Sequence, residues 1–81
     1  MNEKLTDKYD KVFIKSFKIK KDKLKKLKYQ SIPQWDSVGH MSMIGALEDV
    51  FKITFEMDDI IDFSSYNTGK EILKKYKINI A

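Results

Sequence analysis

The chain contains no cysteine, no arginine, one proline and one histidine. Without cysteine it can form neither a disulfide nor a thiolate zinc site. The single histidine, His40, cannot build a metal site alone, and the spacing of the carboxylates matches no metal-binding loop, so we expect no bound metal. The absence of arginine argues against bidentate recognition of phosphates or base edges, for which the guanidinium group is best suited.

Long apolar runs are missing as well. No segment approaches the roughly 20 apolar residues that a membrane-spanning helix needs. The first residues, MNEKLTDKYDKVF, hold no apolar signal core, so we expect no secretory leader and a cytoplasmic protein. A chain of 81 residues can bury one modest core, which predicts a single domain over residues 1–81.

The net charge of +4 is distributed unevenly along the chain. Residues 1–35 hold eleven lysines and four acidic residues, whereas residues 36–62 hold one lysine and seven acidic residues. Residues 63–81 are basic again, with four lysines and one glutamate. An acidic partner surface would therefore meet the two ends of the chain, and a basic partner surface would meet its middle.

Apolar residues recur at three- and four-residue spacing, which predicts a helical protein. The expected elements are a helix over residues 2–17, a Lys-rich connection over 18–35, a helix from 36 or 37 to 51, a short helical turn within 56–63 and a last helix over 68–76. Leu24 and Leu27 could mark a helical turn in the connection, and Pro33 ends any helix there. This order predicts an all-α fold, a small four-helix bundle of three main helices and one short helix.

The same periodicity assigns the residues that face inward. In the short turn and the last helix these are Ile60, Ile61, Phe63, Ile72, Leu73 and Tyr76. On the central helix they are Met43, Ala46, Leu47, Val50 and Phe51. Val38 and Met41 fall among polar residues of the central helix, and Ile44 falls at the border. These three are either ordinary exposed apolar residues or a contact ridge for a partner, guided by Glu48 and Asp49.

Ser37 stands at the start of the central helix, directly after Asp36. The simplest interpretation is a helix cap, because aspartate and serine both cap helices well. A catalytic serine would need a base, for which only His40 is near, and no glycine-rich nucleophile elbow surrounds it. A phosphodiester on Ser37 fits better, because a helix N-terminus offers unpaired N–H groups and the positive end of the helix dipole.

The segment Asp36-Ser37-Val38, followed by Met41, Met43, Ala46-Leu47-Glu48 and Phe51, resembles the central helix of acyl carrier proteins. That family has an Asp-Ser-Leu motif, apolar residues at matching offsets, and an Ala-Leu-Glu segment before a closing Phe. The form Trp-Asp-Ser-x-Gly-His is similar to stand-alone carriers outside the main fatty-acid pathway. The order of the expected helices also follows the family over most of the chain.

The resemblance implies an acyl-carrier-protein-like bundle in which Ser37 receives 4′-phosphopantetheine from coenzyme A. A separate phosphopantetheinyl transferase would add this arm with magnesium, and Asp36 matches the aspartate that helps the transferase place metal and coenzyme A. The thiol of the arm would hold an acyl or aminoacyl group as a thioester. The protein would then be a carrier without catalysis of its own, and we expect a monomer that binds loading and transferring enzymes but no nucleic acid.

The resemblance also assigns a docking surface to the central helix. Val38, Met41 and Ile44 match the exposed apolar contact positions of the family, and Glu48 and Asp49 would meet basic partner enzymes.

The chain departs from the family in its charge. Gly39 and Ser42 stand where many carriers have acidic residues, and the protein as a whole is basic. These departures favour a specialised pathway of lipid or secondary-metabolite biosynthesis over core fatty-acid synthesis.

Two other functions stay open on the sequence. The chain could be an unmodified interaction module with the carrier fold, docking through the Val38, Met41 and Ile44 ridge. Alternatively, the Lys-rich connection could bind nucleic acid or an anionic membrane. Its lysines fit a solvated face better, because no aromatic residues are arranged there as a stacking platform.

Overall fold

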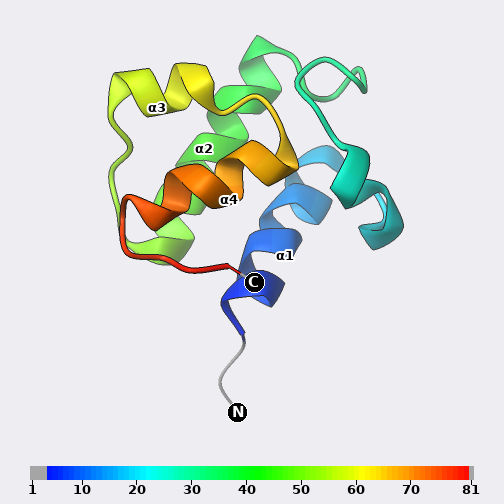
Figure 1. The fold of residues 1–81 in the computed structure, drawn as a ribbon. Coiled ribbons are helices and arrows are strands. Elements are labelled where there is room, and N and C mark those ends of the chain that lie inside the picture. Colours follow the sequence, from blue (N-terminus) through cyan, green and yellow to red (C-terminus); the bar gives the residue numbers. More distant parts are fainter. Residues whose placement is uncertain (1–3, 81) are drawn as a thin grey trace.

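The computed structural model describes residues 4–80, and its regular structure within that range is helical (Figure 1). The elements are α1 (Leu5–Phe17), the 3₁₀ helix η1 (Lys21–Lys26), α2 (Ser37–Phe51), α3 (Met57–Asp62) and α4 (Tyr66–Lys74). The all-α prediction is confirmed for these residues. None of these helices is long and apolar enough to cross a membrane.

The boundaries of the central helix agree with the prediction. α2 begins at Ser37, after Asp36 as the N-cap. α4 begins two residues earlier than predicted, because the Ser65 side chain caps it by accepting a hydrogen bond from the Thr68 N–H. α4 also ends before Tyr76. The predicted start of the first helix at residue 2 lies outside the described residues.

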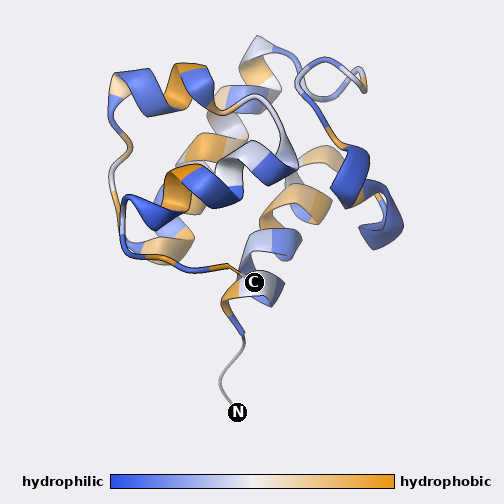
Figure 2. Ribbon diagram, in the orientation of Figure 1, coloured by the Kyte–Doolittle hydropathy of each residue, from blue (hydrophilic) through white to orange (hydrophobic). Residues whose placement is uncertain are grey.

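The core is built largely from aromatic side chains. Phe13 lies at its centre, with its ring centroid 4.9 to 6.2 Å from five other rings. These rings are Tyr9, Phe17, Trp35, Phe63 and Tyr66, all of them buried. Edge-to-face and offset contacts of this kind add to the free energy gained by burying the rings. In Figure 2 the apolar stretches of α1, α2 and α4 alternate with polar ones, whereas η1 is mainly hydrophilic.

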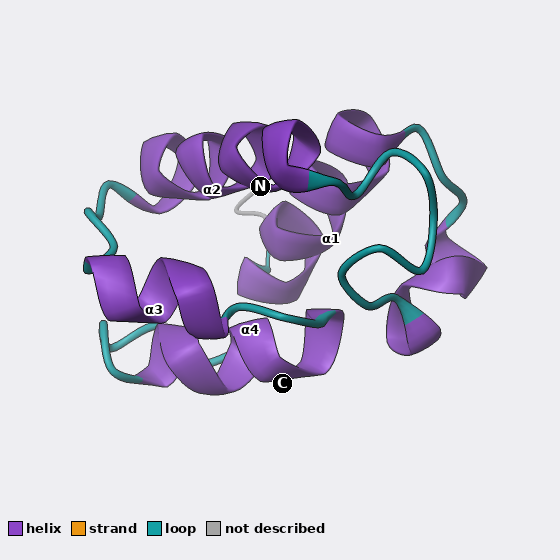
Figure 3. Ribbon diagram, turned by 90° about the horizontal axis from the view of Figure 1, so that it is seen from above, coloured by secondary structure: helices purple, strands orange, loops and turns teal. Residues whose placement is uncertain are grey.

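The helices lie around α1. Seen from above, α2 occupies one side of the molecule and α3 and α4 occupy the other (Figure 3). η1 lies at one end and α3 lies at the opposite end, as Figure 1 also shows. The basic part of the chain and its acidic α3 are therefore held apart by the core.

The buried face of α2 is rotated relative to the prediction. Met43 and Leu47 are buried as expected, but Ile44 is also buried and only 1% exposed. Val50 is exposed. It lies in an open groove between α1 and α2, which is also lined by Val12 and by lysines of α1. The helical wheel ranks positions by angle alone and cannot show on which side the neighbouring helices pack. The predicted burial of Val50 and the border position of Ile44 were therefore wrong.

The inward orientation predicted for Ile61 is also wrong. Ile61 is 70% exposed, whereas Phe63 is buried and Ile60 is half-buried. Successive side chains of a helix are turned by about 100°, and on α3 the buried face is centred on Asp59 and Ile60, so Ile61 points away from it.

A buried carboxylate ties α3 to the end of α4. Asp59 accepts hydrogen bonds from the Lys75 Nζ at 2.6 Å and from the Tyr76 hydroxyl. The hydrogen bond from Lys75, and then the one from Tyr76, hold the pKa of Asp59 below its usual value. A carboxylate with a lowered pKa stabilises the fold above its unfolded-state pKa, and this stabilisation is lost as the pH falls through the folded-state pKa.

We predict that Asp59→Asn lowers the free energy of unfolding at pH 7 by about 1–2 kcal/mol, because the amide loses the charge-assisted bond from Lys75. The difference from the wild type should shrink as the pH falls below about 3.9, the usual pKa of aspartate, since protonation removes the same charge. Urea unfolding followed by circular dichroism at neutral and acidic pH measures both. Asp62→Asn, an exposed position on the same helix, is the control. A destabilisation that does not change with pH would contradict the role of the carboxylate charge.

Candidate functional site

Ser37 is exposed to solvent as the first residue of α2. The carboxylate of Asp36 accepts a hydrogen bond from the Gly39 N–H at 2.8 Å, so of the two candidate caps that the sequence offered it is Asp36, and not Ser37, that caps the helix. The other N–H groups of the first turn have no partner within the helix, and the positive end of the helix dipole lies there. An exposed hydroxyl therefore stands in a field that favours an attached anionic group.

Gly39 allows the tip of α2 to pack closely on the preceding connection. A Cβ atom at this position would lie 2.0 Å from the Gln34 carbonyl oxygen and 3.3 Å from the Phe17 ring. The Gln34 side chain in turn donates a hydrogen bond to the Phe17 carbonyl oxygen at 3.0 Å. Any side chain at Gly39 would displace the backbone of the connection, and so this glycine sets the position of Ser37.

His40 joins three segments beside Ser37. Its Nδ1 accepts a hydrogen bond from the Trp35 indole N–H at 2.9 Å, and its Nε2 lies 2.8 Å from the Ile60 carbonyl oxygen. An indole N–H can only donate and a carbonyl oxygen can only accept, so the imidazole carries its proton on Nε2. Both ring nitrogens are occupied, which leaves His40 no free nitrogen with which to deprotonate Ser37.

Trp35 anchors the connection in the core. It is fully buried and stacks on Phe17, with centroids 5.2 Å apart and an interplanar angle of 23°. It also lies nearly parallel to the His40 ring. The indole therefore belongs to the core and does not flank Ser37 on the surface.

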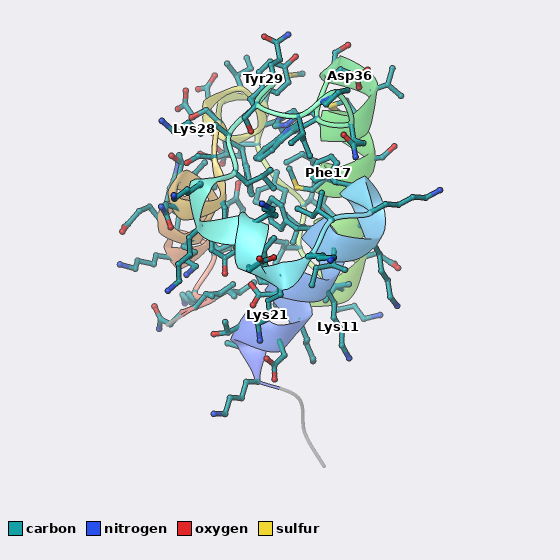
Figure 4. All side chains as sticks on the ribbon, turned by 90° about the vertical axis from the view of Figure 1, so that its right-hand side faces the viewer. Lys11, Phe17, Lys21, Lys28, Tyr29 and Asp36 are labelled. Atoms are coloured by element: carbon teal, nitrogen blue, oxygen red, sulfur yellow. The ribbon has the colours of Figure 1, made fainter. Side chains whose placement is uncertain are left out.

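Backbone hydrogen bonds also join the connection to the segment between α3 and α4 and to the first residue of α4. The Tyr29 N–H donates to the Ser64 carbonyl oxygen at 2.8 Å, and the Tyr66 N–H donates to the Leu27 carbonyl oxygen at 3.0 Å. Figure 4 shows Tyr29 and Asp36 at the same end of the molecule. Residues far apart in the sequence are thus assembled around the tip of α2.

An apolar hollow of about 370 Å³ opens beside Ser37. Its walls come from the connection, α2, α3 and the segment after α3: Tyr29, Ser37, His40, Met41, Met57, Ile60, Ile61, Phe63 and Ser64. Met57 and Ile61 are about as exposed as any apolar residues of the described chain, at 71% and 70%. Neither residue was expected at the site from the sequence, where Ile61 was predicted to face inward. Their four-residue spacing, which places them on one face of α3, was the available signal.

The predicted docking residues of α2 do not all lie on the surface. Val38 and Met41 are 74% and 54% exposed, as expected for a contact ridge. Ile44 is in the core, so its assignment to that ridge is corrected: its side chain cannot reach a partner. Asp49 is exposed, but the half-buried Glu48 accepts a hydrogen bond from the Phe55 N–H at 2.8 Å. Glu48 therefore holds the connection between α2 and α3.

Comparisons with known proteins add no relative: no family model, no curated protein and no solved structure matches this chain. Among residues 4–80, no group of His, Asp or Glu side chains is placed to hold a metal ion. The interpretation of the site therefore depends on its own geometry and on the sequence motif.

We predict that His40→Phe lowers the free energy of unfolding by about 2–3 kcal/mol, because it leaves the buried Trp35 N–H and the Ile60 carbonyl without partners. The fluorescence of Trp35, the only tryptophan, should shift to the red as its surroundings loosen. Urea titrations followed by this fluorescence measure both effects. Ser42→Ala, an exposed position on the same helix, should leave them unchanged. Wild-type stability and an unshifted spectrum in His40→Phe would contradict the bridging role of His40.

Proposed function

We propose that this protein is an acyl or aminoacyl carrier whose Ser37 is esterified with 4′-phosphopantetheine. The observation that carries the proposal is an exposed serine, directly after a capping aspartate, at the tip of a helix that the core holds in place. Asp36-Ser37-Val38 is also the segment on which the resemblance to acyl carrier proteins rests. Under this proposal the helical arrangement is the carrier fold.

The surroundings of Ser37 suit such a group. A phosphodiester on the Ser37 oxygen would lie at the N-terminus of α2, where first-turn N–H groups and the helix dipole stabilise negative charge. When attached, the arm supplies the thiol that holds the cargo, which a cysteine-free chain cannot provide. The neighbouring apolar hollow can shelter apolar parts of the arm or its cargo from water.

The surface around Ser37 suits docking to partner enzymes. Val38 and Met41 on α2 and Met57 and Ile61 on α3 are exposed, and the latter three line the hollow. Exposed apolar side chains near acidic residues of α3 would bind an enzyme that is apolar at the centre of its contact and basic at the rim. The basic charge of the whole chain supports a specialised pathway with its own partners.

We predict that a phosphopantetheinyl transferase, given coenzyme A and magnesium, adds the mass of one phosphopantetheine to the purified chain. Ser37→Ala should abolish the addition, because it removes the only hydroxyl at the helix tip, whereas Ser42→Ala should still be modified. Intact-protein mass spectrometry reads each result, and circular dichroism checks the fold. If a transferase that modifies a reference carrier leaves the wild type unmodified, or if Ser37→Ala still gains the mass, the proposal fails.

A second candidate is an unmodified interaction module that docks through the same surface. The exposure of Val38, Met41, Met57 and Ile61 on two adjacent helices favours it, since these side chains contribute little to the core. The transferase would not modify such a module, and the Ser37→Ala variant would bind the partner as well as the wild type does.

We predict that Met41→Glu slows modification by the transferase by about tenfold, because a charge would replace an apolar contact at the centre of the docking surface. Initial rates measured by mass spectrometry at limiting protein concentration test this. Val50→Glu introduces the same charge at another exposed apolar position of α2, in the groove beside α1. Equal slowing in both variants would show that Met41 is not part of a specific docking surface.

A further inference from the structure

The connection between α1 and α2 presents a concentration of positive charge that the proposed carrier function does not use. Residues 18–28 contain one acidic residue, Asp22, and seven lysines. The lysines are Lys18, Lys20, Lys21, Lys23, Lys25, Lys26 and Lys28, and every one of them is exposed. Within residues 4–80, none of these seven forms an ion pair.

The geometry of η1 explains how these lysines reach the surface together. A 3₁₀ helix has three residues per turn, so side chains three positions apart lie above one another. Within η1 one row holds Lys21 and the buried Leu24, a second holds Asp22 and Lys25, and a third holds Lys23 and Lys26. Lys20 and Lys28 flank the helix, and Leu27 at its C-cap is buried against the rest of the protein. In Figure 4 Lys21 and Lys28 both lie on the face turned to the viewer. We call the surface formed by the seven lysines the basic face.

The segment beneath the basic face is anchored to the core, although like charges side by side repel one another. Leu24 and Leu27 hold it on the core, and the Asn67 side chain donates a hydrogen bond to the Lys25 carbonyl oxygen. A lysine-rich loop that only needed to stay in water would require none of these anchors. These contacts hold the backbone beneath the lysines against the core.

An apolar hollow of about 440 Å³ lies within the basic face. Its walls include Ile19, Leu27 and Ile32, and Lys23 and Lys26 stand at its edge. A cationic rim over an apolar floor matches an anionic amphiphile, in which a charged headgroup stands above ester and acyl groups. The apolar faces of nucleic-acid bases stack on aromatic side chains, and the lining of this hollow contains none.

The composition of the segment also favours a lipid surface over other polyanions. Residues 18–28 contain no arginine and no aromatic residue. Base stacking needs aromatic side chains, and the strongest contacts of protein interfaces come from Trp, Tyr and Arg. Clusters of four to eight basic residues bind anionic membranes without either.

We propose that the basic face docks the protein on anionic phospholipid surfaces. The acidic α3 lies at the opposite end of the molecule, so its carboxylates would point away from the negative headgroups (Figures 1 and 3). Asp36, and with it the tip of α2, lies at the upper rim of the basic face in Figure 4. A protein docked through the basic face would therefore hold Ser37 beside the membrane, where a partner enzyme can still reach it. The proposal does not depend on the modification of Ser37.

Sedimentation with lipid vesicles tests the proposal on the full, unmodified chain. The protein should bind vesicles that contain phosphatidylglycerol and not vesicles of phosphatidylcholine alone at about 0.15 M salt, and binding should be lost near 1 M salt. A variant with Lys20→Gln, Lys23→Gln and Lys26→Gln should bind about a hundredfold more weakly, since each lysine near an anionic membrane contributes about fivefold.

The matched control replaces three exposed lysines outside the basic face. Lys52→Gln, Lys74→Gln and Lys77→Gln together give the same net charge as the first variant and should retain most of the binding. Equal losses in both variants would show that only total charge matters and would overturn the proposal. Equal binding to both kinds of vesicle would also overturn it, as would preferential retention on single-stranded RNA or poly-glutamate.

Discussion

The site depends on one imidazole that is hydrogen-bonded on both sides. His40 accepts from the Trp35 indole and donates to the Ile60 carbonyl oxygen, so it connects the Lys-rich connection, α2 and α3 at one point. Because the indole is stacked in the core on Phe17, this chain of contacts reaches from α1 to the tip of α2. Ser37 and the adjacent hollow owe their positions to these contacts.

Close packing and exposure are combined within one turn of α2. Gly39 permits the helix to touch the connection, and Asp36 completes the first turn, yet Ser37 between them stays in water. A rigid base with an accessible hydroxyl suits a residue that carries a long flexible group, since the helix fixes the point of attachment while the group itself can move.

The two proposed surfaces differ in charge and approach one another near the tip of α2, where Tyr29 of the hollow follows Lys28 of the basic face. The apolar surface beside Ser37 extends to the acidic α3, whereas the basic face extends over η1, which lies at the opposite end of the molecule from α3. Like charges are thereby kept together and unlike charges apart, which raises the electrostatic potential at each end. A molecule built in this way could bind a basic enzyme and an anionic lipid surface at the same time.

The sequence alone determined the features that depend on local interactions. The end of α2, a cap at residue 36 or 37, the exposure of Ser37, Val38 and Met41, and the helical fold follow from caps and periodicity, which involve residues within a few positions of one another. Only the tertiary structure decided that Ile44 is buried, that Val50 and Ile61 are exposed and that Glu48 binds the Phe55 N–H. It also decided the partners of His40, because Ile60 lies twenty positions away in the sequence. Border positions of a helix are buried or exposed according to which segments pack beside them, and that arrangement is a property of the whole chain.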